Sequence, residues 1–316
     1  MTRYLCQRLL LMLPTLVLVS VMVFLIMRLI PGDVVSLMFS DLGYASSLEA
    51  MRARLGLDQP LPAQYAHWMA DVLRGHLGES LWTQRTVVSV IAERLPVTLE
   101  LAFLALGFAV VYGVGTGLVA AVWQDRWPDM VLRSVAMAFL SLPTFWLGTL
   151  AIVLPSLYLG WSPSIQLVAF RSDPLGHLAQ FALPAVLLGT HLGAPLMRMS
   201  RAMTLEILRQ DYIRTAWAKG LDERRVVIKH AFRNAVIPPM TILGVQMSQA
   251  IAGSVVVETL FQLPGMGSLL VEAVAHRDFP MFQSLVLCVA LFVMAINLLV
   301  DLACLAIDPR LRGQAG

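Results

Sequence analysis

The chain has 316 residues, of which 58% are hydrophobic and only 14% are charged, and its mean hydropathy is +0.74. Soluble domains carry roughly 25% charged residues, so this composition excludes an ordinary cytosolic enzyme, a disordered chain and a disulfide scaffold. The formal net charge of +3 is small, and its placement along the chain matters more than its sum. We therefore interpret the chain as an all-α integral membrane protein.

Long uncharged stretches predict six membrane-spanning helices. The first stretch lies between Arg8 and Arg28 and would form a helix about 28 Å long, close to the hydrocarbon thickness of about 30 Å. The stretch 134–170 is too long for one span, and the break at Gly160-Trp161-Ser162-Pro163 ends a helix within it. The six helices are expected near residues 9–30, 97–123, 131–156, 180–200, 236–258 and 282–305.

Most Lys and Arg residues fall in the segments that would be cytoplasmic if the N-terminus were inside, which predicts that both termini are cytoplasmic. The first helix should stay as an anchor, because Arg28–Asp33 offers no small-residue cleavage site. None of the three cysteines, Cys6, Cys288 and Cys304, falls in an exported loop. The predicted organisation is a cytoplasmic N-terminus with the first span (1–30), an exported helical loop (31–96) and a five-helix core (97–316).

The exported loop is expected to be helical. Ser46-Ser47-Leu48-Glu49 matches a capping box that opens a helix closed by Gly56. A second helix is predicted over Ala63–Arg74, with Pro62 early and Gly75 at its end, and a third over Val87–Arg94 leads towards the second span. The loop could be a cap packed on the bundle or a docking surface for an external partner, and the residues favour neither.

The cytoplasmic segment Arg201–Arg233 predicts two helices joined by an elbow. Thr204–Lys219 has the apolar spacing of an amphipathic helix. Gly220 can end that helix in a left-handed conformation, and Asp222 can cap a second short helix rich in cations. This elbow is typical of a docking element. A positive-inside loop that lies on anionic lipid is the alternative.

The sequence lacks the common signatures of catalysis and of ion coupling. A P-loop needs a Lys after Gly, and the two lysines follow Ala218 and Ile228. No His-Glu-x-x-His zinc motif occurs, and the six histidines are scattered. Ionisable residues within the spans would mark an ion-coupled carrier. The predicted spans are nearly free of such residues, and His191 and Asp301 are the exceptions. These observations predict no metal, no cofactor and an external source of energy.

At this elbow the sequence resembles the EAA loop of binding-protein-dependent ABC importer permeases, most closely the dipeptide, oligopeptide and nickel branch. Of the general Glu-Ala-Ala-x-x-x-Gly pattern only Ala216 and Gly220 match, since Arg214 and Thr215 stand at the Glu and first Ala positions. The form of the motif that is typical of the dipeptide, oligopeptide and nickel branch fits better. The matching residues are Tyr212, Ala218-Lys219-Gly220 and His230–Ala235 before Pro238. Further similar segments are Pro31-Gly32-Asp33, Leu55–Leu61, Leu77–Ser80, Arg94–Leu101, Leu142–Gly148, Glu258–Phe261 with Pro264–Gly267, and Arg277–Pro280.

The resemblance implies a type I ABC importer permease fold with six transmembrane helices, and a subunit with no catalytic activity of its own. It implies a heterodimer with a second homologous permease subunit, two ATPase subunits, an extracytoplasmic solute-binding protein and no nucleic acid. The location would be the cytoplasmic membrane of a bacterium. The solute would be a dipeptide or oligopeptide, or a related small solute such as nickel or glutathione.

The resemblance also assigns roles in coupling to the segment 201–235. Gly220 would set the turn, while Tyr212, Ala216 and Leu221 would fill a groove on the ATPase. The runner-up hypothesis is an ion-coupled secondary carrier or channel of unrelated fold, and a membrane-embedded hydrolase is a third. The coupling residues implied are Tyr212, Thr215, Ala216, Ala218, Lys219, Gly220, Leu221 and Asp222.

Overall fold

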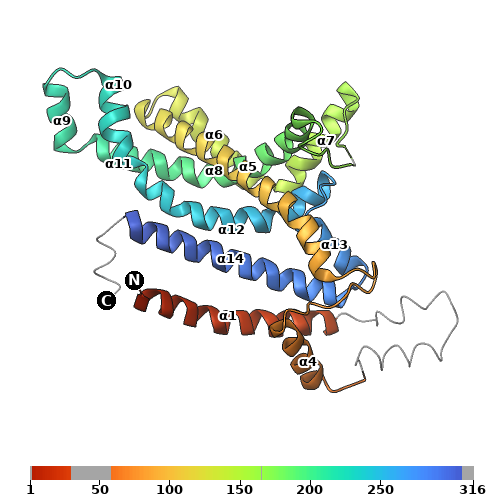
Figure 1. Ribbon diagram of the computed structural model, residues 1–316. Coiled ribbons are helices and arrows are strands. Elements are labelled where there is room, and N and C mark those ends of the chain that lie inside the picture. The colour runs from red at the N-terminus through yellow and green to blue at the C-terminus, as the bar shows by residue number, and fades with distance from the viewer. Residues whose placement is uncertain (1, 30–57, 165, 308–316) are drawn as a thin grey trace. The chain divides into compact units, whose positions relative to one another are not determined.

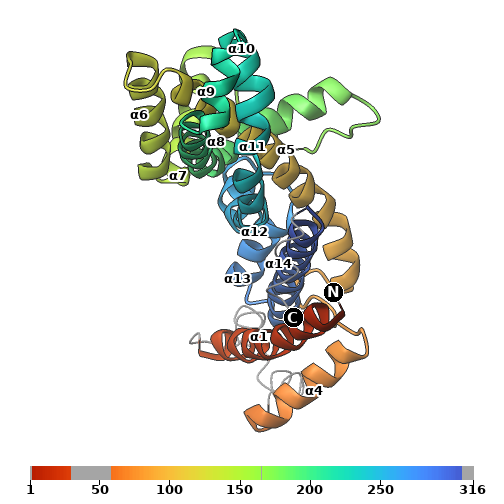
Figure 2. The ribbon, with the colours of Figure 1, turned by 90° about the vertical axis from the view of Figure 1, so that its left-hand side faces the viewer.

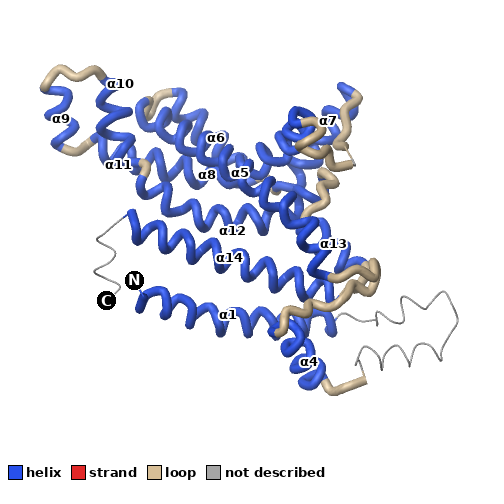
Figure 3. Tube along the Cα trace, in the orientation of Figure 1, coloured by secondary structure: helices blue, strands red, loops and turns tan. Residues whose placement is uncertain are grey.

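The computed structural model describes residues 2–29, 58–164 and 166–307. These residues are helical apart from loops and one isolated bridge between Glu79 and Thr86, as Figure 3 shows. The chain forms two compact units, one of residues 1–95, 269–295 and 310–316 and the other of residues 96–268 and 296–309. The capping box predicted at 46–49 lies outside the described residues.

The first unit is built around α1 (Thr2–Leu29), α4 (Leu61–Leu73) and the start of α14 (Phe279–Ile307). Aromatic side chains join α1 to α4, since the Phe24 ring lies 5.3 Å from that of Tyr65 and 6.0 Å from that of Trp68. The prediction of a helix with Pro at its start and Gly75 beyond its end is confirmed, and Gly75 has φ +83°.

A buried carboxylate anchors the loop that follows α4. Ser80 Oγ donates to Asp278, which also accepts from the backbone N–H of Met281 at 3.3 Å and so caps the start of α14. Ser284 Oγ donates to the carbonyl of Leu77 at 3.2 Å. Two of the motifs identified in the sequence, residues 77–80 and 277–280, therefore meet in this unit.

The helix predicted over Val87–Arg94 and the second predicted span form one helix, α5 (Val87–Val122). The helix continues through Pro96, although proline inside a helix removes one hydrogen bond and commonly costs about 3 kcal/mol. Val90 and Ile91 before it and Val97 and Leu101 after it are buried, and we attribute the continuity to this burial. Pro96 also marks the boundary between the two units.

The continuous helix predicted over 131–156 is wrong. The structure has two helices there, α6 (Trp127–Ser141) and α7 (Thr144–Leu159), bent by 101°. Leu142 is extended, with φ −85° and ψ 131°, as expected for a residue before proline. Pro143 then starts α7 as its N-cap, so each helix is shorter than the roughly 20 residues that a span requires.

Among the residues that the structure describes, four helices are long and apolar enough to cross a membrane, or up to five if the bent pair α6–α7 is one span. The apolar part of α1, Leu10–Ile26, is shorter. The six spans expected from the sequence are thus matched only in part among the described residues. The four helices are α5, α8 (Pro174–Leu208), α12 (Ile237–Leu260) and α14.

Glycines allow α5 and α8 to approach closely. A Cβ added to Gly113 of α5 would lie 2.5 Å from the carbonyl oxygen of Gly193 in α8, and one added to Gly193 would lie 2.7 Å from Tyr112. Small residues at such contacts let helix backbones pack closely in a membrane, where van der Waals contact rather than hydrophobicity joins helices. A buried cluster near this contact joins Ala120 of α5, Ala136 of α6, and Ala194 and Met197 of α8.

Candidate coupling site

The predicted elbow is present at the end of α8, in the second unit. It consists of α9 (Asp211–Ala218), α10 (Glu223–Arg225), the π-helix η1 (Val226–Phe232) and α11 (Arg233–Ala235). Figures 1 and 2 show α9, α10 and α11 gathered near the end of α8. The sequence predicted one helix over 204–219, but the chain breaks at Arg209 and Gln210, where Gln210 is extended with ψ 151°.

The break lets the elbow form a small hydrophobic core. Ile213, Ala216, Val226 and Ala231 are buried together, and partly buried Ile207, Leu208 and Leu221 pack against them. Ala216 therefore lies inside the elbow as part of this buried cluster, and Leu221 packs against the cluster from its edge. Within the chain both side chains pack in the contact between α9 and η1, and the expectation that they fill a groove on a partner stays a prediction.

Gly220 makes the turn between α9 and α10. Its φ is +77°, and nothing lies within 4 Å of the position where a Cβ would stand. Its N–H donates to the carbonyl of Trp217 at 2.9 Å, and the N–H of Leu221 donates to that of Ala216 at 3.4 Å. These two hydrogen bonds form a Schellman motif, so the glycine is needed for its conformation and not for space.

The turn is completed by Asp222. Its carboxylate accepts a hydrogen bond from the backbone N–H of Arg225 at 3.1 Å, which caps α10 as the sequence predicted. Thr215 donates its hydroxyl to the carbonyl of Asp211 at 3.0 Å, within α9. The elbow is consequently a compact unit with its own core, turn and cap.

The outer face of the elbow exposes aromatic and basic residues. Tyr212 is 42% exposed and Trp217 is 43% exposed, and the Tyr212 hydroxyl accepts a hydrogen bond from Asn234 at 3.1 Å. Trp217 and the exposed Ile228 were not among the predicted site residues. The available signal for Trp217 was the apolar stripe itself, because Trp217 stands four residues after buried Ile213 and therefore lies beside the stripe on α9. Ala218, Lys219, Arg224, Arg225 and Lys229 are also exposed.

A buried ion pair, which the sequence reasoning missed, fixes α8 just before the elbow. Arg201 of α8 donates from Nε and Nη2 to the two carboxylate oxygens of Asp129 in α6, at 2.7 Å each. Arg133 lies 3.1 Å from the same carboxylate, which is fully buried. Bidentate pairs of this kind have defined geometry. The spacing of four residues between Asp129 and Arg133 in α6 was the signal that could have been read.

A third buried carboxylate, Glu258, organises the end of α12. It accepts hydrogen bonds from Thr98 Oγ1 at 2.8 Å and from the backbone N–H groups of Gly267 and Ser268 at 2.7 and 3.1 Å. Those N–H groups belong to the start of α13 (Met266–Ala275), where a negative charge is favoured. A Cβ at Gly265 would lie 2.3 Å from the carboxylate, so this glycine gives the acid room.

Other candidates from the sequence have ordinary environments. His191 lies with Nδ1 3.3 Å from the carbonyl oxygen of Phe139. The side chain of Asp301 lies outside the described part of the structure. Within the described part, no group of three or more His, Cys, Asp or Glu side chains could hold a metal ion.

Comparison with known proteins agrees with this architecture. Residues 113–313 match the family described as binding-protein-dependent transport system inner membrane component, and residues 1–102 match the N-terminal region of that transport system membrane component. A methionine ABC transporter, MetNI, in its inward-facing conformation shares the fold, with a TM-score of 0.57 at 15% identity over 69% of this chain and 96% of its own.

Relatives are similar over nearly their whole length. A peptide transport system permease protein of Brucella suis biovar 1 (strain 1330) is 42% identical over 98% of this chain and 99% of its own. The glutathione transport system permease protein GsiC of Escherichia coli (strain K12) is 40% identical over 99% of each chain. The chain belongs to the family of binding-protein-dependent ABC importer permeases, whose members are non-catalytic membrane subunits.

Proposed function

We propose that this permease forms one half of a heterodimeric pore that imports peptides or glutathione. Relatives named for peptide and for glutathione transport match the chain at similar identity, 42% and 40%, so the two solutes are considered together. Nickel stays the alternative solute implied by the sequence. The other half would be a second homologous permease, with two ATPase subunits inside and a solute-binding protein outside.

The elbow is proposed to be the contact with an ATPase subunit. The observation that carries this is the combination of a rigid internal core with an outer face that exposes Tyr212 and Trp217. Surface aromatic residues of this kind are enriched where proteins bind each other. The surrounding Lys219, Arg224 and Arg225 would steer an acidic partner, since charges act mostly on the rate of association.

Movement of the ATPases would reach the pore through α8. A ligand can shift a conformational equilibrium only through contacts that differ between states, so the elbow must move as a body. The pair between Asp129 and Arg201 would then carry that movement from α8 to the bent pair α6–α7. Alternating access follows, with ATP binding opening the pore outwards to accept solute from the binding protein.

The proposed topology retains six crossings, with both termini in the cytoplasm. Helix α1 has 28 residues, which corresponds to about 42 Å at 1.5 Å per residue and is long enough to cross the bilayer. The bent pair α6–α7 would count as one crossing. The end of α1 and all of α4 would then lie on the exported side.

Reconstitution tests this function. The permease should co-purify with its two ATPase subunits, and proteoliposomes should take up labelled dipeptide or glutathione only with ATP and a loaded binding protein. A protonophore should leave uptake unchanged, whereas an ion-coupled carrier would lose it. Competition between unlabelled dipeptide, glutathione and Ni²⁺ identifies the solute. Uptake without ATPase subunits would contradict the proposal.

A further inference from the structure

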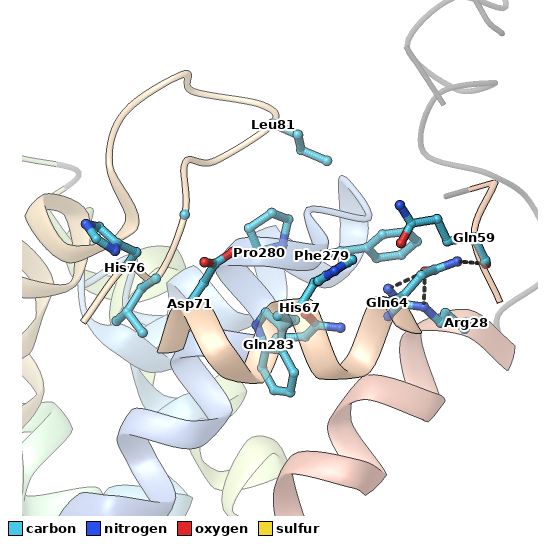
Figure 4. A pocket seen from close by; sticks show the side chains of 13 residues that line it. Arg28, Gln59, Gln64, His67, Asp71, His76, Leu81, Phe279, Pro280 and Gln283 are labelled. Atoms are coloured by element: carbon cyan, nitrogen blue, oxygen red, sulfur yellow. Dashed lines mark hydrogen bonds between the residues drawn. The ribbon is translucent and has the colours of Figure 1, made fainter. Parts of the chain in front are cut away.

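A cavity of about 240 Å³ lies within the first unit, among the end of α1, α4, the loop after α4 and the start of α14. Figure 4 shows Arg28 at one end of it, joined to Gln64 by hydrogen bonds, and Asp71 with His76 towards the other end. His67 and Asp71 on the rim are exposed, whereas Gln283 is only 3% exposed. The cavity thus has an open rim and a buried interior.

Two of the residues that line the cavity carry donors without acceptors. The indole Nε1 of Trp68 and the amide Nε2 of Gln283 are both buried and have no hydrogen-bond partner among the described residues. Burying an N–H group without an acceptor is unfavourable, and such groups are uncommon in folded proteins. A group that brings acceptor oxygens into the cavity would therefore satisfy both side chains.

The charge of the cavity favours an anionic acceptor. Arg28 donates from Nε and Nη2 to Gln64 Oε1 at 3.0 and 2.8 Å and from Nη1 to the carbonyl of Phe24 at 3.2 Å, and it lies over the Phe24 ring at 3.5 Å. The guanidinium is therefore held in place, and a ligand would bind the second N–H of Nη1 and of Nη2. Asp71 is the one carboxylate among the described lining residues, and its oxygen lies 3.7 Å from Arg74. Arg28, His67 and His76 are the basic residues of the lining.

The volume limits the ligand to a small group. Pockets for drug-sized ligands have volumes of about 300–1,000 Å³, and this cavity is smaller. An oligopeptide would not fit, whereas one side chain would. A carboxylate is the acceptor that Arg binds best, because its two oxygens match the guanidinium.

We propose that this cavity receives the carboxylate of an Asp or Glu side chain on the extracytoplasmic solute-binding protein. The proposal rests on the proposed function, which places the end of α1 on the exported side. The incoming oxygens would accept from Arg28, Trp68 Nε1–H and Gln283 Nε2–H. The loop after α4, anchored to α14 through Ser80 and Asp278, would hold the opening in position.

The chemistry of the site can be tested on the purified permease without its partners. The full chain is labelled with fluorotryptophan and its fluorine NMR spectrum is recorded. The variant Trp68→Phe identifies the resonance of Trp68, because that signal is missing from its spectrum. Propionate, which resembles a Glu side chain, should shift this resonance saturably, and neutral propionamide should not. The exposed Trp82 serves as the control resonance. Gln283→Leu should weaken the effect of propionate about tenfold. No shift with propionate, or an equal shift with propionamide, would overturn the site.

The source of the carboxylate is tested in the assembled transporter. With Trp68→Phe the concentration of loaded binding protein that half-maximally stimulates ATP hydrolysis should rise about tenfold, with basal hydrolysis unchanged. The matched variant Trp82→Phe should leave that concentration unaltered. If Trp68→Phe leaves it unaltered too, docking through this cavity is refuted. Failure of the chain to assemble with ATPases would instead refute the proposed function, which the propionate titration does not require.

Discussion

Replacement of Gly220 by Val should uncouple transport without preventing membrane insertion. Gly220 has φ +77°, and no atom lies within 4 Å of an added Cβ, so the cost comes from the backbone and not from a clash. A residue with a Cβ loses roughly 1–2 kcal/mol in this conformation, which corresponds to a factor of about 5–30 in the population of the native turn. The Schellman hydrogen bonds of Gly220 and Leu221 would be lost with it.

The measurement is ATP-dependent uptake and ATPase stimulation at matched membrane abundance. Gly220→Asn should retain most activity, because Asn adopts the left-handed conformation more readily than other residues. Gly160→Val is the matched control, since Gly160 also has positive φ, +64°, and an empty Cβ position outside the elbow. Full activity of Gly220→Val, or equal loss in Gly160→Val, would refute the assignment of the elbow as the coupling element.

Three other predictions follow from the buried carboxylates and the topology. Asp129→Asn should lower stability in detergent by about 2 kcal/mol, because Arg201 loses its ionic partner, whereas Asp211→Asn, at an exposed pair, should change it by less than about 1 kcal/mol; equal thermal midpoints would contradict this. Thr98→Val should lower the midpoint more than Thr259→Val, because Thr98 donates to buried Glu258, and the reverse order would refute the role of that network. Reporter fusions should be exported at Gly75 and cytoplasmic at Gln210, and a cytoplasmic Gly75 fusion would invert the topology.

The sequence by itself determined the membrane class, the main apolar helices and the turn at Gly220. These features depend on local chemistry. Uncharged length decides whether a helix can enter a bilayer, and a Gly followed by a capping Asp specifies a helix end. The helix after Pro62 was predictable for the same reason, because proline at the first turn loses no hydrogen bond.

Tertiary structure decided whether Pro96 and Pro143 interrupt a helix. Pro96 lies within a continuous α5, whereas Pro143 separates α6 from α7 with a bend of 101°. Local preference is the same at both positions. Buried neighbours flank Pro96 on both sides, while Ser141 and Phe145 around Pro143 are exposed.

Tertiary structure likewise decided which residues of the elbow face outward. The pattern of α9 identified an amphipathic helix, yet only the packing of η1 against it shows that Ala216 is buried and Trp217 is exposed. The contact between Thr98 and Glu258 joins residues 160 positions apart. Helix propensity and apolar spacing act over a few residues, whereas such a contact exists only once the helices have packed, and that is why no local pattern could reveal it.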